Sequence, residues 1–344
     1  MNDSNTIKSS KSITMNDIAS EAGVSVATVS RYINHLNVSE KRAKRVEDAI
    51  KKFNFKPNLA AKGLKTSRSK QIMLVVPDIK NPYYSSMYNV VQDLVNKKGY
   101  VAILYNTNES VDNEKKAINL IHQLNCDGVV FCSTTDNKEI VEKLIELDRP
   151  IISSTSFESG YFDTVHGKIS GYGVYLGTSY LIKNGHKKIA YAGGNEDSIY
   201  NKRRYSGFLR AINENNLKFN NNYYHSSPFS IEGGIESAKY FMSLKEKPTA
   251  IACANDMIAI GVIKELNEKG INVPDDVSVV GMDNIELSSL IKPALTTVTN
   301  DSAEFATKAI ELLFDRINGN YSGPSREMIC SRELIIRDTV KKLV

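Results

Sequence analysis

The sequence predicts a small all-α head that contains a helix-turn-helix, followed by a larger α/β body of two lobes. Three observations predict this fold class. The first 70 residues carry 14 Lys and Arg against six Asp and Glu, whereas the rest of the chain has a net charge of −3. Three short helical patterns follow one another in residues 14–64. From Gln71 onward, apolar runs of strand length alternate with amphipathic helical segments, which is typical of parallel sheets covered by helices.

The head is expected to hold three helices. Thr14 can cap the first helix, because Asp17 lies at the spacing of a capping box, and Gly23 suits the turn that follows. Ser25 can cap a second helix over 26–34. A third helix over 39–53 would bury an apolar face and expose its cationic side chains, which are Lys41, Arg42, Lys44 and Arg45. This order predicts a helix-turn-helix on a basic surface, as in DNA-binding modules.

The second helix would then enter the major groove of DNA. Arg31 can donate to guanine, and Val26 and Ala27 can pack on thymine methyl groups. Short polar side chains suit phosphate oxygens, and those in the head are Thr14, Ser25, Thr28 and Asn34. The alternative is a small helical bundle whose basic face is merely solvated.

Residues 57–70 are expected to form a hinge. Pro57 suits the first turn of a helix, but Gly63 and the polar tail weaken that helix, so it would fold only when paired. Leu64 would be an exposed apolar side chain without a core, as a wedge in the minor groove must be.

The head and hinge carry a long motif. Residues 18–31 read IASEAGVSVATVSR, and Val38-Ser39 and Pro57-Asn58 follow. This run resembles the lactose-repressor/galactose-repressor (LacI/GalR) family of bacterial transcription regulators. The resemblance implies base contacts by Val26, Ala27 and Arg31, and hinge helices that pair across a dimer and open the minor groove. The hinge residues that it places on DNA are Asn58, Ala61, Leu64 and Lys65.

In the body, seven apolar runs predict buried strands, at 72–76, 101–105, 128–132, 151–153, 188–193, 249–253 and 278–282. The resemblance continues here in segments such as NDMIAIG at 255–261 and PALTTV at 293–298. It implies an effector domain like a periplasmic sugar-binding protein, with two lobes joined by three crossings. The expected domains are a DNA-binding domain at 1–56, a hinge at 57–70, a first lobe at 71–164 and 297–323, and a second lobe at 165–296 and 324–344.

Polar and aromatic residues follow several of the expected strands, and ligands of open parallel sheets bind at the carboxyl ends of strands. A carboxylate, a bidentate Arg and an aromatic face together describe how proteins hold a sugar. The effector positions that the resemblance implies are Tyr83, Tyr84, Ser133, Ser198, Tyr200, Arg204, Phe229, Asn255 and Asp283. Structural roles stay open for three residues near these strand ends: Asp256 as a helix cap, Asp283 as a loop cap and Tyr84 as lobe packing.

Two segments depart from the family. Residues 167–170 read GKIS where an Asp-Asn pair is usual, and SSTS follows Ile152 where the family often has an Asp followed by Arg or another pocket residue. The identity of the ligand is therefore left open by the sequence.

Sequence motifs of enzymes are lacking. There is no phosphate-binding loop, no nucleophile elbow and no clustering of the five His with carboxylates at metal-ligand spacing. We therefore expect no enzymatic activity, no cofactor and no metal. The four Cys are scattered, and no apolar run is long enough for a signal or a membrane helix, so reduced thiols in the cytoplasm are expected.

These expectations combine into one hypothesis. The chain would be a cytoplasmic, homodimeric transcriptional repressor that binds a palindromic operator in double-stranded DNA and is switched by a small sugar between its lobes. The alternative in the same class is co-repression by a purine or by a phosphorylated carrier protein. A sugar-handling enzyme fused to a DNA-binding head is the alternative from another class, and turnover of bound sugar would reveal it.

Overall fold

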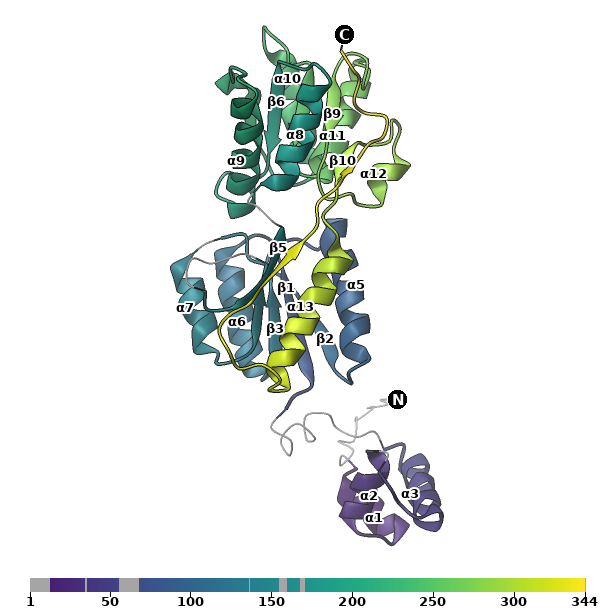
Figure 1. The fold of residues 1–344 in the computed structure, drawn as a ribbon. Coiled ribbons are helices and arrows are strands. Elements are labelled where there is room, and N and C mark those ends of the chain that lie inside the picture. The colour runs from purple at the N-terminus through teal and green to yellow at the C-terminus, as the bar shows by residue number, and fades with distance from the viewer. Residues whose placement is uncertain are drawn as a thin grey trace, which may run out of the picture. The chain divides into compact units, whose positions relative to one another are not determined.

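The computed structural model describes residues 13–34, 36–55, 68–135, 137–154, 160–167 and 171–343. The chain forms two compact units, Met1–Ser69 and Lys70–Val344. The fold has the head and the two-lobed α/β body that the sequence predicts (Figure 1).

The first unit is a three-helix head made of α1 (Met15–Ala22), α2 (Val26–Ile33) and α3 (Glu40–Phe53). The predicted capping box is confirmed, because the Thr14 N–H donates to Asp17 Oδ2 at 2.8 Å and the Asp17 N–H donates to Thr14 Oγ1 at 3.4 Å. Gly23 ends α1 with a φ of 58°, and Ser25 Oγ accepts from the Thr28 N–H at 3.2 Å, as predicted. The small core is centred on three side chains with no exposed surface, Ile18, Val29 and Val46.

Arg45 lies on the exposed face of α3, as predicted, and it has a structural role as well. It donates from Nε to the carbonyl oxygen of Ala22 at 2.7 Å and from Nη2 to that of Gly23. It therefore satisfies carbonyl groups at the end of α1 and holds α3 against the helix-turn-helix.

The second unit begins with a six-stranded sheet in which every pairing is parallel and the order is β11-β5-β4-β3-β1-β2. Its strands are β1 (Gln71–Val76), β2 (Val101–Asn106), β3 (Gly128–Phe131), β4 (Ile151–Ser153), β5 (Asp163–Gly167) and β11 (Glu327–Cys330). Its helices are α5 (Pro82–Asn96), α6 (Val111–Gln123), α7 (Lys138–Glu146) and α13 (Ser302–Ile317).

Strand β1 shows why this sheet needs helices on both faces. Ile72 and Leu74 belong to the core cluster that includes α5 and α13, whereas Met73 and Val75 belong to the cluster that includes α6 and α7. Successive side chains of a strand point to opposite faces, so a continuous apolar run is buried on both sides.

The second lobe has a four-stranded parallel sheet with the order β7-β6-β8-β9. Its strands are β6 (Ile189–Gly193), β7 (Tyr224–Ser226), β8 (Ala250–Cys253) and β9 (Ser278–Val280). Its helices are α8 (Tyr172–Lys183), α9 (Ile199–Glu214), α10 (Ile231–Ser243), α11 (Asp256–Glu268) and the short α12 (Leu287–Leu290). Helices α10 and α11 touch at Gly234 and Gly261, where an added Cβ would lie about 2 Å from the carbonyl oxygen of the facing helix.

In the second lobe, β10 (Thr297–Val298) pairs antiparallel with β12 (Leu334–Ile335) and packs against α8. The lobe boundaries expected from the sequence need correction here. Residues 165–167 and 327–330, assigned to the second lobe, are strand residues of the first sheet, where Val165 and Cys330 are buried in its core. Thr297, assigned to the first lobe, instead donates from Oγ1 to Asp256 of α11 at 2.5 Å.

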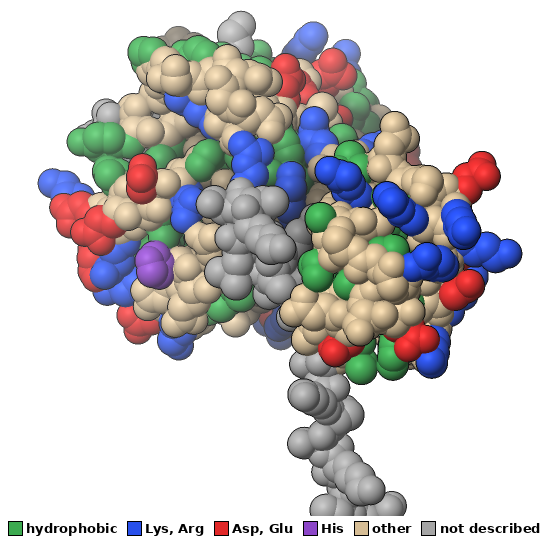
Figure 2. Space-filling model, turned by 90° about the horizontal axis from the view of Figure 1, so that it is seen from below, with side chains coloured by type: hydrophobic (Ala, Val, Ile, Leu, Met, Phe, Trp, Pro, Cys, Tyr) green, Lys and Arg blue, Asp and Glu red, His purple; other side chains and the backbone are tan. Residues whose placement is uncertain are grey.

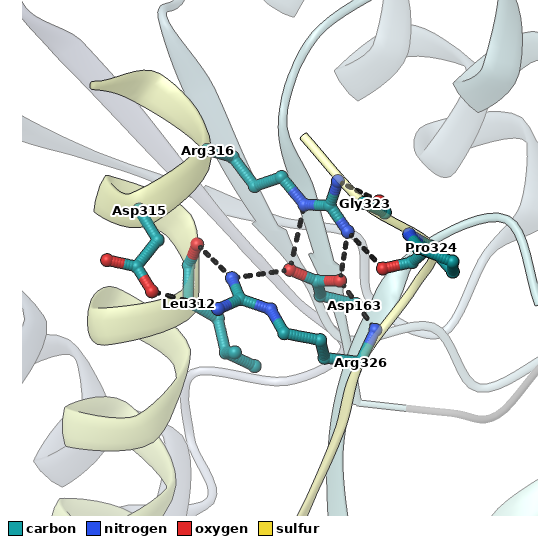
Figure 3. A network of polar contacts seen from close by, with 7 residues as sticks. All are labelled: Asp163, Leu312, Asp315, Arg316, Gly323, Pro324 and Arg326. Carbon is teal, nitrogen blue, oxygen red and sulfur yellow. Dashed lines mark hydrogen bonds and ion pairs between the residues drawn. The ribbon is translucent and has the colours of Figure 1, made fainter. Parts of the chain in front are cut away.

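The start of β5 is tied to α13 by a buried ionic network (Figure 3). The Asp163 carboxylate accepts from Arg316 Nε at 3.0 Å and Nη2 at 2.7 Å, and from the N–H and Nη2 of Arg326 at 2.7 and 3.1 Å. Arg326 also donates from Nη1 to Asp315 at 2.8 Å. Because Arg316 lies on α13 and Arg326 directly precedes β11, the network fixes the last helix and the edge strand of the sheet.

Candidate nucleic-acid interface and ligand cleft

Helix α2 presents the residues that the sequence places in the major groove. Ala27 and Arg31, four residues apart on one face, are exposed, and Val26 and Thr28 are half-buried beside them. Ser25 and Thr28 join their hydroxyl groups at 3.0 Å, and Thr14 is exposed. The Asn34 side chain donates back to the Ser30 carbonyl oxygen at 2.8 Å, so it closes the end of α2.

The exposed face of α3 adds Lys41, Arg42 and Lys44 to this unit. Figure 2 shows Lys and Arg side chains in blue on this face of the molecule, together with Asp and Glu side chains in red. The predicted hinge contacts Asn58, Ala61, Leu64 and Lys65 lie outside the described residues. The contacts of the head with DNA stay predictions.

The second unit contains a cleft of about 240 Å³ at the carboxyl ends of strands from both sheets. Seven of the nine predicted effector residues line it, namely Tyr83, Tyr84, Tyr200, Arg204, Phe229, Asn255 and Asp283. Residues that the sequence reasoning missed line it as well, and the polar ones include Asn81, Glu109, Ser154, His166, Asn300 and Arg332.

An ion pair lies at the centre of the second-lobe wall. Arg204 Nη2 is 3.2 Å from Asp283 Oδ1, and Arg204 Nη1 donates to the Ala254 carbonyl oxygen at 2.7 Å. Asn300 donates to the same Asp283 oxygen at 3.1 Å. Burial raises the pKa of the Asp283 carboxyl, and Arg204 and Asn300 oppose that rise. The pair therefore offers both a donor and an acceptor in a site with little water.

Three aromatic rings face the same space. The Arg204 guanidinium lies over the Phe229 ring, 5.6 Å from its centroid, and an added Cβ at Gly194 would lie only 2.0 Å from that ring. Tyr83 and Tyr84 meet edge to face at 5.0 Å in the first turn of α5, which Asn81 caps. Burial raises the pKa of both tyrosines, so both stay protonated donors at neutral pH. Tyr84 lines the cleft, and it also contacts the first-lobe core.

Asp256, for which a helix cap was the alternative to ligand contact, does neither, because Asn255 caps α11. Asn255 caps α11 by accepting from the Ile258 N–H at 2.9 Å, and it also lines the cleft. Asp256 accepts from Thr297 Oγ1 at 2.5 Å and from the Ile285 N–H at 2.9 Å, and it does not line the cleft. Burial and the nearby Asp283 raise its pKa to about 7. Asp256 therefore holds the loop after β9 and the start of β10 in place.

Two predicted effector residues do not line the cleft. Ser133 is fully buried, and its hydroxyl donates to Glu114 Oε1 at 2.9 Å. Burial raises the pKa of Glu114 to about 7, so this serine satisfies a carboxyl group in the first lobe. Ser198 precedes α9 and is 5% exposed, with its side chain turned away from any helix-capping bond. Sequence position alone placed both near the strand ends, but the direction of a side chain in a loop is set by its neighbours.

Three hydrogen bonds join the lobes beside the cleft. The Ser154 and Tyr200 hydroxyl groups lie 2.6 Å apart, and the Ile199 N–H donates to the Thr134 carbonyl oxygen at 2.9 Å. Asn195 donates from Nδ2 to Glu109. These contacts hold the lobes together on the side of α9.

The described residues contain no helix that is both long and apolar enough to cross a membrane. Within the same residues, no group of three or more His, Cys, Asp or Glu side chains is placed to hold a metal ion. The four cysteines are free and buried.

Comparisons with known proteins agree with this architecture. Residues 14–58 match "Bacterial regulatory proteins, lacI family", and residues 178–340 match "Periplasmic binding protein-like domain". The HTH-type transcriptional repressor PurR of Mannheimia succiniciproducens is 34% identical over 347 residues, which cover 96% of this chain and 99% of that protein. A helix-turn-helix head joined to such a two-lobed domain defines a DNA-binding transcriptional repressor. The chain belongs to the LacI family of bacterial regulatory proteins, and the resemblance seen in its sequence is confirmed.

Solved structures show the same fold. The Lac repressor dimer bound to operator and the anti-inducer ONPF matches with a TM-score of 0.86 at 24% identity, over 96% of this chain and all of that chain. A LacI family transcriptional regulator from Enterococcus faecium with bound ribose matches with a TM-score of 0.69 at 26% identity, over 80% of this chain and all of that chain.

Proposed function

We propose that this chain is a cytoplasmic, homodimeric repressor that binds a palindromic operator and is switched by a small sugar between its lobes. The head would read bases in the major groove through Val26, Ala27 and Arg31. Paired hinge segments would contact the minor groove through residues that include Leu64. The two heads of a dimer are related by two-fold symmetry, so the operator that they bind would have two half-sites in inverted order.

The observation that best supports a sugar as the effector is the cluster of Arg204, Asp283 and Asn255 beside the Phe229 ring. Asp283 can accept from sugar hydroxyl groups, Arg204 can donate to sugar oxygens, and an aromatic face can pack on the apolar face of a sugar ring. The Enterococcus faecium regulator, which shares this fold, was solved with bound ribose. The cluster and this likeness both support a sugar as the effector.

A purine is the second candidate, because Tyr83, Tyr84 and Phe229 offer three rings to the cleft. Aromatic rings stack on the flat face of a base as readily as on a sugar. The Arg204–Asp283 pair suits a purine as well, because a guanidinium can donate to purine O6 and N7 and a carboxylate can accept from purine N–H groups.

Switching requires that the ligand prefer one arrangement of the lobes. Its contacts come from both lobes, since Tyr84 belongs to the first lobe and Arg204 to the second. A ligand that touches both would favour closure of the cleft, and closure would change the spacing of the paired heads.

The test is a thermal-shift screen of the intact protein against pentoses, hexoses, disaccharides and purines. A ligand that binds only the folded state adds about 2.7 kcal/mol of stability at a hundredfold excess over Kd. Asp283→Asn should weaken binding of the sugar that is found by about tenfold or more, because a hydroxyl acceptor is lost. The thermal midpoint of the free variant checks that it folds.

DNA selected from a random pool by the intact protein then tests the switch. The proposal predicts two inverted half-sites and an operator affinity that changes when the sugar is added. A shift with purines alone would favour the second candidate. Selection of no DNA sequence would contradict the proposed operator binding whatever the screen shows.

A further inference from the structure

Arg332 is a cation that faces the ligand cleft from the segment between β11 and β12. Its Nη1 donates to the neighbouring Ser331 carbonyl oxygen at 2.8 Å. It forms no ion pair with a carboxylate among the residues described, although it is only partly exposed. A half-buried guanidinium without a carboxylate partner is unusual, because desolvation of a charge is costly unless an anion offsets it.

Glu333, next to Arg332 in this segment, is exposed, and three other carboxylates around the segment already have partners. Asp283 pairs with Arg204, and Glu304 accepts from Lys308 Nζ at 2.6 Å and from the Ser331 N–H at 3.1 Å. Glu327, in β11, pairs with His166. The other acidic groups of the cleft, Asp78 and Glu109, follow β1 and β2, and Glu109 is bound by Asn195.

The Arg332 guanidinium packs against the backbone of β5. A Cβ added at Gly167, the last residue of β5, would lie 3.1 Å from Arg332 Nη2 and 3.2 Å from Cζ. The small residue at this position therefore leaves room for the planar guanidinium beside the strand. Burial raises the pKa of Tyr83 in the first lobe and of Asp283 in the second lobe, and the positive charge of Arg332 opposes both rises. Arg332 therefore interacts electrostatically with groups of both lobes.

We propose that the effector is an anionic sugar derivative whose phosphate ester or carboxylate pairs with Arg332 while its hydroxyl groups meet Arg204 and Asp283. The guanidinium fork matches either anion, and such charge-assisted pairs are stronger than neutral hydrogen bonds. The assignment rests on the proposed sugar-responsive function and narrows it, because a neutral sugar would leave the Arg332 guanidinium without an ion pair in the closed cleft.

The experiment uses titration calorimetry on the full-length protein at low ionic strength. The ligands are ribose and glucose, their phosphate esters ribose 5-phosphate and glucose 6-phosphate, and the acids ribonate and gluconate. Wild type should bind one anionic member at least about tenfold more tightly than its neutral parent. Arg332→Gln should reduce that ratio to less than about twofold, because the anionic member loses its charged partner and the neutral parent loses none. The phosphate and carboxylate arms show which anion is recognised.

Lys218→Gln is the matched control, because it removes one positive charge from an exposed position that does not line the cleft. It should leave the ratio of affinities unchanged. Neutral and anionic sugars that bind wild type equally well would overturn the anion site and leave the sugar-responsive function standing. An anion preference that persists in Arg332→Gln would overturn the role of this residue. Binding of neither class would overturn the anion site together with the sugar effector.

Discussion

At the scale of single residues, the stability of the first lobe depends on the Asp163 carboxylate. Its side chain is 1% exposed and accepts hydrogen bonds from Arg316 and Arg326 (Figure 3). Asp163→Asn should lower the free energy of unfolding by about 3 kcal/mol, because two guanidinium groups lose a buried partner. Asp315→Asn is the control, since Asp315 is more exposed and pairs with Arg326 alone, and its cost should stay below about 1 kcal/mol. Urea unfolding at pH 7 measures both.

The same carboxylate gives a pH dependence of known sign. Burial would raise the pKa of Asp163, but hydrogen bonds from Arg316 and Arg326 outweigh it and hold the pKa below the usual 3.8. The contribution of Asp163 to stability is therefore present above pH 3.8 and lost as the pH falls through its folded-state pKa. Wild type should lose more stability than Asp163→Asn between pH 5 and pH 3. Equal losses would show that another group controls the acid transition.

Residues also differ in whether their contacts can be predicted from the sequence alone. The capping box of Thr14 and Asp17 could be predicted, because both partners lie within one helical turn. Asp163 and Arg316 are 153 positions apart, and no local pattern pairs them. The place of Arg332 in the cleft could not be predicted from local sequence either, because it depends on the pairing of β11 with β5.

At the scale of elements, helix α2 carries the prediction for DNA. Arg31→Ala should cost about 1–3 kcal/mol per half-site and relax base choice at one position, because a bidentate contact to guanine is lost. Lys51→Ala is the control, as Lys51 lies at the end of α3 and pairs with Glu47. Fluorescence anisotropy on the selected operator and on single-base variants measures both. An unchanged base preference in Arg31→Ala would contradict its placement in the groove.

The strands show what the apolar pattern can and cannot predict. All seven expected runs correspond to strands, and all but β2, an edge strand that is only partly buried, are almost fully buried. Strands β5 and β11 were not expected, and their sequences DTVHG and EMIC mix polar with apolar residues. Strand β11 forms one edge of the sheet and β5 lies next to it, and the polar residues of both strands weaken the apolar pattern. The lobe boundaries were misplaced for this reason.

At the scale of the whole molecule, ligand binding and DNA binding must be coupled through the lobes. Asn195 bonds to Glu109 across the side of the cleft and does not line the cleft itself. Its replacement therefore changes the balance between open and closed lobes without removing a ligand contact. By linkage, the effector and the operator must alter each other's affinity by the same factor.

Asn195→Ala should weaken effector binding by about fivefold, because one interlobe hydrogen bond of about 1 kcal/mol is lost. If the closed lobes bind the operator, operator affinity without effector should fall as well, as expected for co-repression. If the open lobes bind it, operator affinity should rise, as expected for induction. Asn213→Ala, at an exposed position on α9, is the control and should change neither affinity. Weaker effector binding with an unchanged operator affinity would show that closure of the cleft is not coupled to DNA binding by the heads.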